Sequence, residues 1–239
     1  MGLDEMRIAD PSVSRVVGES DILGTLLKLD GAAVLELGCG KAEKTRIVAE
    51  QAASVLALEV DEIQLEKNLA LPGLDNVRFG HGGAEQIPAG DACFDIVLMF
   101  KSLHHVPVEQ MDRALSEIER VLKPGGVAYL SEPVYAGDYN AILSLFNDEK
   151  NVREAAFDAI RRAVSSKHFE LVGQTFFLQP VHFDDFAQFE RQTIRVTHMD
   201  HQLSPTLFEQ VRSTFNGRMT PGGVDYLHPM RVDLLRKVG

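Results

Sequence analysis

The chain has 239 residues, of which 45% are hydrophobic and 25% charged, so it can bury one substantial core. Its formal charge is -11, and the acidity lies in residues 1–132, which carry 12 basic and 22 acidic side chains. That balance supplies no basic face for nucleic acid, and no apolar run is long enough to cross a bilayer. We therefore expect a cytoplasmic domain over residues 1–239 that acts on a small molecule, without a nucleic-acid or membrane partner.

Short apolar runs alternate with helix-prone stretches between residues 22 and 132, a pattern typical of a doubly wound, mostly parallel sheet. The runs are almost continuously apolar, which indicates strands covered by helices on both faces. Strands are predicted at 33–37, 55–60, 77–79, 96–100 and 127–130, and helices at 44–53, 63–69 and 109–122. The sequence LysProGlyGly at 123–126 should end the last of these helices.

The pattern changes after Pro133. Residues 138–166 form a long helix-prone stretch, which predicts a helical pair inserted after the fifth strand. Later strands are expected at 169–178 and 226–235. The fold class is therefore α/β, a doubly wound sheet flanked by helices, with a helical insertion after the fifth strand.

The most informative motif is ValLeuGluLeuGlyCysGlyLysAla at 34–42, which puts a glycine turn at the carboxyl end of the first strand. Ligands of open α/β sheets bind at this edge, and Gly38 and Gly40 allow backbone to approach a ligand closely. A dinucleotide-binding turn would need a third glycine where Glu43 stands, which disfavours a nicotinamide oxidoreductase.

The motif resembles the first motif of the class I S-adenosylmethionine-dependent methyltransferases, in which an acidic residue precedes three alternate glycines. Glu36, Gly38 and Gly40 match, and Ala42 stands at the third glycine. The resemblance implies a Rossmann-like methyltransferase fold, S-adenosylmethionine as cofactor, and a cofactor loop formed by Glu36, Gly38, Cys39 and Gly40.

Further motifs follow in the family's order. Glu59 ends the second strand, where the family places a carboxylate on the ribose hydroxyls; Val60 follows it, and Asp61 is a possible substitute for Glu59. Residues 82–88 resemble the adenine segment, but the usual acidic position holds Gly83. Either Glu85 makes that contact or the backbone around Ala84 reads the adenine edge.

The same resemblance makes Ile87 the apolar cover of the adenine and puts Phe100 beside the amino acid portion of the cofactor. Phe94–Val106 resembles the fourth strand and its following loop, and Asp95 is expected to be structural, at the edge away from the ligand. Together the motifs span about 100 residues, so residues 1–132 form the predicted cofactor-binding half and 133–239 the substrate-facing half.

Methyl transfer from a sulfonium needs positioning above all and does not require an acid or base. His104 and His105 follow the fourth strand and are the candidate general bases, with loop packing as the alternative. Lys41 and Lys101 are interpreted as solvated side chains in preference to ligands of a carboxylate.

Some histidines and arginines of the second half have suggestive spacing. His198 and His201 could present ligands from one helical turn, with His182 or His228 as partners, but no third ligand is determined by spacing and we expect no metal site. Arg191 and Arg195, one helical turn apart, are interpreted as a solvated helix face.

We therefore predict an enzyme that transfers a methyl group from S-adenosylmethionine to a small-molecule acceptor. The first alternative is a non-catalytic relative that binds S-adenosylmethionine as a sensor or partner subunit. The second is a Rossmann-type nicotinamide oxidoreductase.

Overall fold

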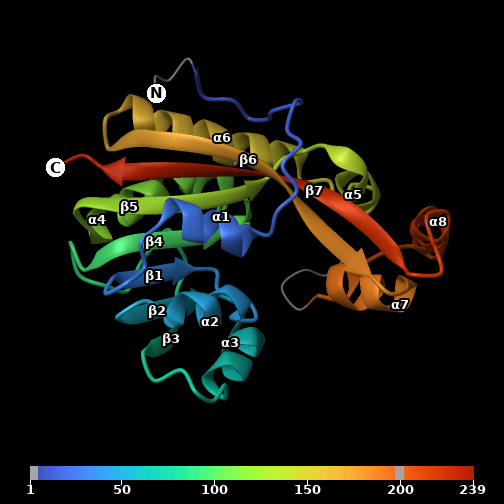
Figure 1. The fold of residues 1–239 in the computed structure, drawn as a ribbon, viewed down its shortest axis with the longest axis horizontal. Helices are drawn as coiled ribbons and strands as arrows, with labels where there is room; N and C mark the ends of the chain where they lie inside the picture. Colours follow the sequence, from blue (N-terminus) through green and yellow to red (C-terminus); the bar gives the residue numbers. More distant parts are fainter. Residues whose placement is uncertain (1–4, 197–201) are drawn as a thin grey trace.

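A computed structural model of the chain describes residues 5–196 and 202–239. Its sheet has the strand order β3-β2-β1-β4-β5-β7-β6, drawn from the bottom to the top of Figure 1. The first five strands run parallel, and β7 lies antiparallel between β5 and β6. The strands are β1 Ala33–Leu37, β2 Ser54–Glu59, β3 Val77–His81, β4 Phe94–Phe100, β5 Leu122–Pro133, β6 Phe169–Phe183 and β7 Val224–Lys237.

The doubly wound sheet and each strand predicted from an apolar run are confirmed. β1 has the predicted bounds, whereas β5, β6 and β7 extend well beyond theirs. The longer strands include polar side chains such as Glu132 and Asp233, which are buried because they pair with charged partners. Periodicity therefore identified the apolar centre of each strand but not its polar ends.

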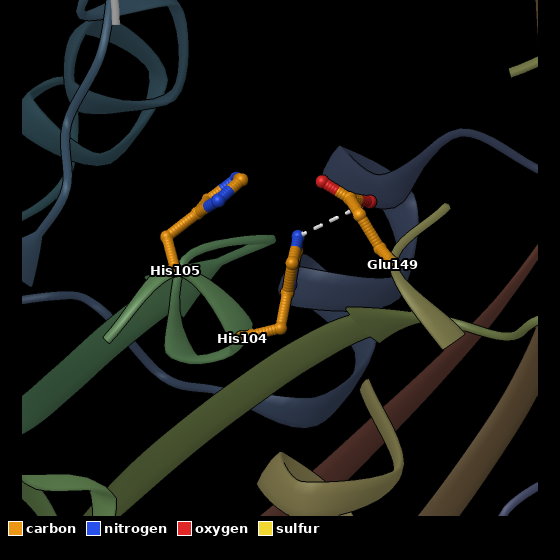
Figure 2. A group of neighbouring side chains, drawn as sticks. All are labelled: His104, His105 and Glu149. Atoms are coloured by element: carbon orange, nitrogen blue, oxygen red, sulfur yellow. Dashed lines mark ion pairs between the residues drawn. The ribbon is translucent and has the colours of Figure 1, made fainter. Parts of the chain in front are cut away.

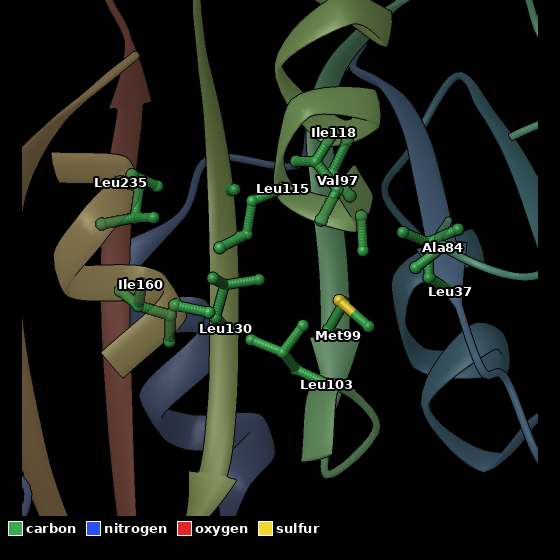
Figure 3. Close-up of a cluster of buried hydrophobic side chains, with 14 of the residues drawn as sticks. Leu37, Ala84, Val97, Met99, Leu103, Leu115, Ile118, Leu130, Ile160 and Leu235 are labelled. Atoms are coloured by element: carbon green, nitrogen blue, oxygen red, sulfur yellow. The ribbon is translucent and has the colours of Figure 1, made fainter. Parts of the chain in front are cut away.

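Helices cover both faces of this sheet. α4 and α6 pack on one face, where Leu115, Ile118 and Ile160 contact the apolar side chains of β4, β5 and β7 (Figure 3). α1 and α2 bury Ile22, Leu23 and Val48 against the other face. The helices are α1 Glu19–Leu26, α2 Glu43–Ala49, α3 Glu62–Leu69, α4 Met111–Val121, α5 Gly137–Leu143, α6 Lys150–Ser165, α7 Phe186–Phe189 and α8 Pro205–Asn216.

The predicted end of α4 is close to the observed one. The helix ends at Val121 and Leu122 is already extended, so LysProGlyGly begins β5 and does not form the last helical turn. Gly125 takes the left-handed conformation, with φ +75°. At the same edge Lys123 pairs with Asp95, and Asp95 also accepts the Ala33 N–H at 2.9 Å, so it joins β1, β4 and β5 at the amino ends of the strands.

The helical pair predicted over 138–166 is present as α5 and α6. α6 packs beside α4 and completes the helix layer on the sheet. A second helical segment lies between β6 and β7 and contains α7, a π-helical turn η4 Glu190–Ile194, and α8. The sequence predicted only a helix face at Arg191 and Arg195 within it. With the far ends of β6 and β7 this segment forms a third apolar cluster at one end of the molecule (Figure 1).

Among the residues that the structure describes, no helix combines the length and apolar character needed to cross a membrane.

Candidate active site

A cleft of about 920 Å³ opens at the carboxyl ends of β1, β2 and β4. Parallel strands end at the same edge of a sheet, so the loops that follow them converge there. One wall is contributed by residues 191–196, between β6 and β7. The lining residues are Leu37, Gly38, Gly40, Lys41, Glu59, Val60, Asp61, Gln64, Lys67, Gly82, Gly83, Ala84, Glu85, Met99, Phe100, Lys101, Ser102, His105, Val106, Pro107, Arg191, Gln192, Arg195 and Val196.

Gly38 and Gly40 are needed for different reasons. Gly38 has φ +72°, and a Cβ on it would lie 2.8 Å from Cβ of Ser102, whose hydroxyl donates to the Leu37 carbonyl at 2.9 Å. Gly40 has φ +51°, and a Cβ there would meet no protein atom within 4 Å. The first glycine thus lets the β1 and β4 loops touch, whereas the second leaves space open in the cleft.

Ala42, at the third glycine position of the motif, also has a left-handed backbone, with φ 58°. It immediately precedes α2 and is fully buried. An alanine pays roughly 1–2 kcal/mol for this conformation. The turn therefore keeps the glycine-type geometry even though the residue is not glycine.

Glu59 lies at the base of the cleft, with 7% of its surface exposed. Its Oε2 accepts the Gly40 N–H at 2.7 Å, and its Oε1 accepts the N–H groups of Val60 and Asp61 at 2.9 and 3.0 Å. These bonds hold the carboxylate in one orientation between the β1 and β2 loops. Since Oε2 carries a single hydrogen bond, it can accept a further one from a ligand.

Glu36 and Cys39, both predicted to bind cofactor, lie beneath the glycine loop and do not line the cleft. Glu36 accepts a hydrogen bond from the Thr45 hydroxyl at 2.7 Å, and burial raises its pKa to about 7. Cys39 is buried against Asn68, and burial raises the pKa of its thiol. Both side chains are buried and support the loop from inside, Glu36 from β1 and Cys39 from within the loop itself.

Glu85 is the acidic residue that the segment 82–88 brings into the cleft. A Cβ on Gly83 would lie 2.7 Å from Cδ of Glu85, so the carboxylate occupies the space of a residue 83 side chain. Ala84 lines the cleft beside it. Of the two readings of this segment, the geometry favours the one in which Glu85 supplies the carboxylate.

Ile87 does not reach the cleft, although it was predicted to cover the adenine. It is 3% exposed and belongs to the main apolar core. Glu117 accepts its N–H and Arg120 donates to its carbonyl, at 3.0 and 3.1 Å, so α4 turns this part of the loop inward. Val60, 57% exposed, is the apolar side chain that lines the cleft at the β2 end.

Phe100 is the last residue of β4 and Lys101 follows it directly. Both line the cleft. Phe100 packs against Tyr129 with ring centroids 5.5 Å apart, which fixes its position in the wall. Lys101 has φ 54°, a rare conformation for a residue with a side chain, and its N–H donates to the Ser131 carbonyl at 2.7 Å. Strained backbone of this kind is often found where a side chain must point into a functional site.

His104 and His105 have different environments. His105 is exposed and lines the cleft, whereas His104 is 4% exposed. Nδ1 of His104 is hydrogen-bonded to Glu132, whose other oxygen accepts the Leu103 N–H at 2.9 Å. Burial would raise the pKa of Glu132, but the charge and hydrogen bond of His104, with smaller contributions from Leu103 and Arg231, lower it overall.

Glu149, just before α6, faces the other side of the His104 ring. Its Oε2 lies 3.7 Å from Nε2 of His104 and accepts from Arg153 at 2.6 Å. Burial raises the pKa of Glu149, but the charges of His104 and Arg153 outweigh burial and lower it. Neither Glu132 nor Glu149 was predicted to lie at this site, because each approaches His104 from a distant segment of the chain.

The histidines of the second half do not gather as a site among the described residues. His182 is exposed and pairs with Asp225 and Asp184, whereas His228 is buried, and burial lowers its pKa to about 3. His198 and His201 lie outside the described residues. Arg191 and Arg195, predicted to form a solvated helix face, both line the cleft, and Arg195 also pairs with Glu190.

Comparison with known proteins agrees with this geometry. A family model described as a methyltransferase domain matches residues 35–130 of the chain. This range includes the end of β1, the glycine loop, Glu59, Glu85 and Phe100. Over these residues the chain is similar to the class I S-adenosylmethionine-dependent methyltransferases. S-adenosylmethionine is the methyl donor of this family.

Similarity extends over different shares of individual relatives. The chain is 29% identical over 199 residues to the 27-O-demethylrifamycin SV methyltransferase of Amycolatopsis mediterranei, covering 79% of this chain and 68% of that protein. It is 36% identical over 107 residues to the phthiotriol/phenolphthiotriol dimycocerosates methyltransferase of Mycobacterium tuberculosis, covering 43% and 38%. In the first curated relatives that it matches, the chain spans only 38% to 45% of their length.

The fold also agrees with solved structures. The YcgJ protein of Bacillus subtilis superposes on the chain with a TM-score of 0.64 and 18% identity, over 91% of this chain and 97% of that one. The residues present fit S-adenosylmethionine: open space at Gly40 admits a ligand against the backbone, and Glu59 and Glu85 present carboxylates on the cleft. Gln64 and Lys67, one turn apart on α3, also line it and were missed; their i, i+3 spacing was the available signal.

Proposed function

We propose that this protein transfers a methyl group from S-adenosylmethionine to a small-molecule acceptor. The observation that carries the proposal is the placing of Glu59 and Glu85 around one cleft that also contains the open face of Gly40. These groups match the needs of a ligand with ribose hydroxyls, an exocyclic amine and a flexible amino acid tail. When bound, S-adenosylmethionine supplies an electrophilic methyl group on a positively charged sulfur.

The proposed donor contacts follow from the position of each group. Glu59 accepts hydrogen bonds from the ribose hydroxyls through its less occupied oxygen, Oε2. Glu85 accepts one from the adenine amine, and Val60 covers an adjacent apolar surface. The glycine loop and Phe100 flank the amino acid portion, while Glu36 and Cys39 act only by supporting that loop.

The acceptor end of the cleft is proposed to lie beyond β4, between His105, Lys101 and Arg191. Only His105 of the histidine pair lines the cleft, so it is the imidazole that can take a proton from a hydroxyl acceptor. His104 is a positioning residue, since Glu132 holds its Nδ1 and its ring contacts that of His105 at 4.1 Å between centroids. The cationic side chains at this end favour an acceptor that carries negative charge.

The non-catalytic alternative loses part of its support. It was motivated by Gly83 and Ala42, but Glu85 fills the space at residue 83 and Ala42 keeps the left-handed turn. The oxidoreductase alternative has no third glycine in the loop and is opposed by the family match to a methyltransferase domain. A sensor would bind S-adenosylmethionine without turnover on any acceptor.

The decisive experiment is calorimetric titration of the purified protein with S-adenosylmethionine and its demethylated product. Binding of both is expected, and Glu59→Gln should weaken it about tenfold or more, since hydrogen bonds to charged groups contribute roughly 1.5–3 kcal/mol. Glu62→Gln is the matched control, because Glu62 is exposed on α3 and does not line the cleft. Equal affinity for the wild type and Glu59→Gln would remove Glu59 from the site, and no binding at all would refute the proposal.

A further inference from the structure

Three side chains of metal-ligand type meet next to the acceptor end of the cleft, which only His105 of the three lines. His104, His105 and Glu149 each offer an atom that lies within 4.8 Å of the other two. Figure 2 shows the rings of His105 and His104 side by side and the Glu149 carboxylate opposite the His104 ring. Two come from η2 Leu103–His105 after β4, and the third comes from the start of α6.

We propose that His104, His105 and Glu149 form a binding site for a divalent transition-metal cation. Two imidazoles and one carboxylate suit Zn²⁺ or Co²⁺, whereas Mg²⁺ prefers a shell of oxygen ligands. Three protein ligands leave a coordination position for water or substrate, as in catalytic zinc sites. Since His105 lines the cleft, that position faces the proposed acceptor.

The distances suit a bridging ion better than a direct bond. Oε2 of Glu149 is 3.7 Å from Nε2 of His104, which is beyond hydrogen-bonding range. Two ligand atoms each about 2.0–2.1 Å from a tetrahedral ion lie roughly 3.3 Å apart, so a small closure would complete the site. The structure thus brings the two atoms within ion-pairing distance, marked by the dashed line in Figure 2, but not within hydrogen-bonding distance.

The surroundings of the three residues prepare them as ligands. Glu132 holds Nδ1 of His104, which leaves Nε2 as the ring atom that faces Glu149, and carboxylates commonly orient metal-binding histidines in this way. Glu149 is held by Arg153 at 2.6 Å and by Asn147 at 2.9 Å. The two carboxylates of Glu132 and Glu149 and the guanidinium of Arg153 together carry one net negative formal charge, which a bound cation would balance.

The role of such an ion in turnover rests on the proposed function, whereas its binding does not. An acceptor hydroxyl bound to the ion would release its proton to solvent more readily. Its oxygen then forms a bond to the methyl carbon as the carbon–sulfur bond breaks, with the electron pair remaining on sulfur. In the metal-loaded protein the ion therefore replaces His105 as the group that activates the acceptor.

Cobalt is the probe for this site. After chelation and dialysis, titration with Co²⁺ should give visible absorption bands that saturate at one equivalent, should be reversed by Zn²⁺, and should not be affected by Mg²⁺. Glu149→Gln and His105→Asn should each abolish the bands. His168→Asn, which alters an exposed histidine paired with Glu119 elsewhere, should retain them.

Each outcome separates this site from the donor site. Absence of the bands, or their persistence in both cluster variants, refutes the metal site. S-adenosylmethionine affinity measured on the same samples tests the donor site alone, because Glu149 does not line the cleft. If Glu149→Gln fails to fold by circular dichroism, the exposed position of His105 makes His105→Asn the deciding variant.

Discussion

The carboxylate of Glu85 occupies the space that a side chain on residue 83 would fill, with its Cδ 2.7 Å from the Cβ position of Gly83. The acidic group of the adenine segment is therefore supplied from two residues further along the chain. Gly83 is required because any side chain there would displace that carboxylate.

We expect Glu85→Ala to lower the affinity for S-adenosylmethionine about tenfold, since it removes a charged hydrogen-bond acceptor. Gly83→Ala should weaken binding to a similar degree although it removes no functional group. The double variant Gly83→Asp with Glu85→Ala should recover much of the loss by returning the carboxylate to residue 83. Calorimetry on the four proteins checks this, and full affinity in Glu85→Ala would contradict it.

Gly40→Ala and Gly31→Ala separate backbone strain from ligand exclusion. The two glycines have φ values of +51° and +71°, and a Cβ on either meets no protein atom within 4 Å. Each variant should lose roughly 1 kcal/mol of stability in urea unfolding. Only Gly40→Ala should also impair S-adenosylmethionine binding, because only Gly40 lines the cleft; an equal effect of both on binding would count against the loop assignment.

Lys101 has a left-handed backbone conformation, which is strained for a residue with a side chain. Lys101→Gly and Lys101→Ala both remove the ammonium group, but the glycine variant should be more stable by about 1 kcal/mol because the strain is released. Both should slow turnover of an anionic acceptor equally. Chemical unfolding together with a methylation assay tests the pair, and equal stabilities would show that the φ of 54° is not strained.

Glu36 gives the protein a pH-dependent stability. Burial raises its pKa from 4.5 to about 7, so the folded chain holds a proton that the unfolded chain releases between these values. The contribution of this proton to the free energy of unfolding is complete below pH 4.5 and is lost as the pH rises through 7. The total change in the free energy of unfolding is on the order of 3 kcal/mol.

Glu36→Gln keeps an acceptor for Thr45 and cannot titrate, so its unfolding free energy should lack this component. The difference between the urea-unfolding free energies of variant and wild type should therefore change in the variant's favour between pH 5 and 7.5. Parallel profiles would show that Glu36 titrates normally.

Much of the sheet could be predicted because strands covered on both faces must be apolar. The same reasoning located the carboxyl ends of β1, β2 and β4, and with them Gly38, Gly40, Glu59 and Phe100 on the cleft. Such positions are local: a glycine turn or strand-ending acid has its place determined by the adjacent strand.

Residues whose orientation depends on distant contacts could not be predicted in this way. Ile87 is turned inward by Glu117 and Arg120, and Glu149 meets His104 only because α6 packs beside α4. The segment of α7 and α8 has no periodic signal comparable with α4. The cytoplasmic location and the division into halves at residue 132 stay predictions.

The antiparallel pair of strands β6 and β7 continues past the end of β5. Together with the helical segment that joins the two strands, it forms a separate apolar cluster in which Phe183, Phe189 and Phe215 pack together. One wall of the cleft therefore belongs to a part that packs on its own apolar cluster, apart from the two clusters on the faces of the sheet. Donor binding by the glycine loop and Glu59, and acceptor selection by the wall at residues 191–196, would therefore depend on different segments of the chain.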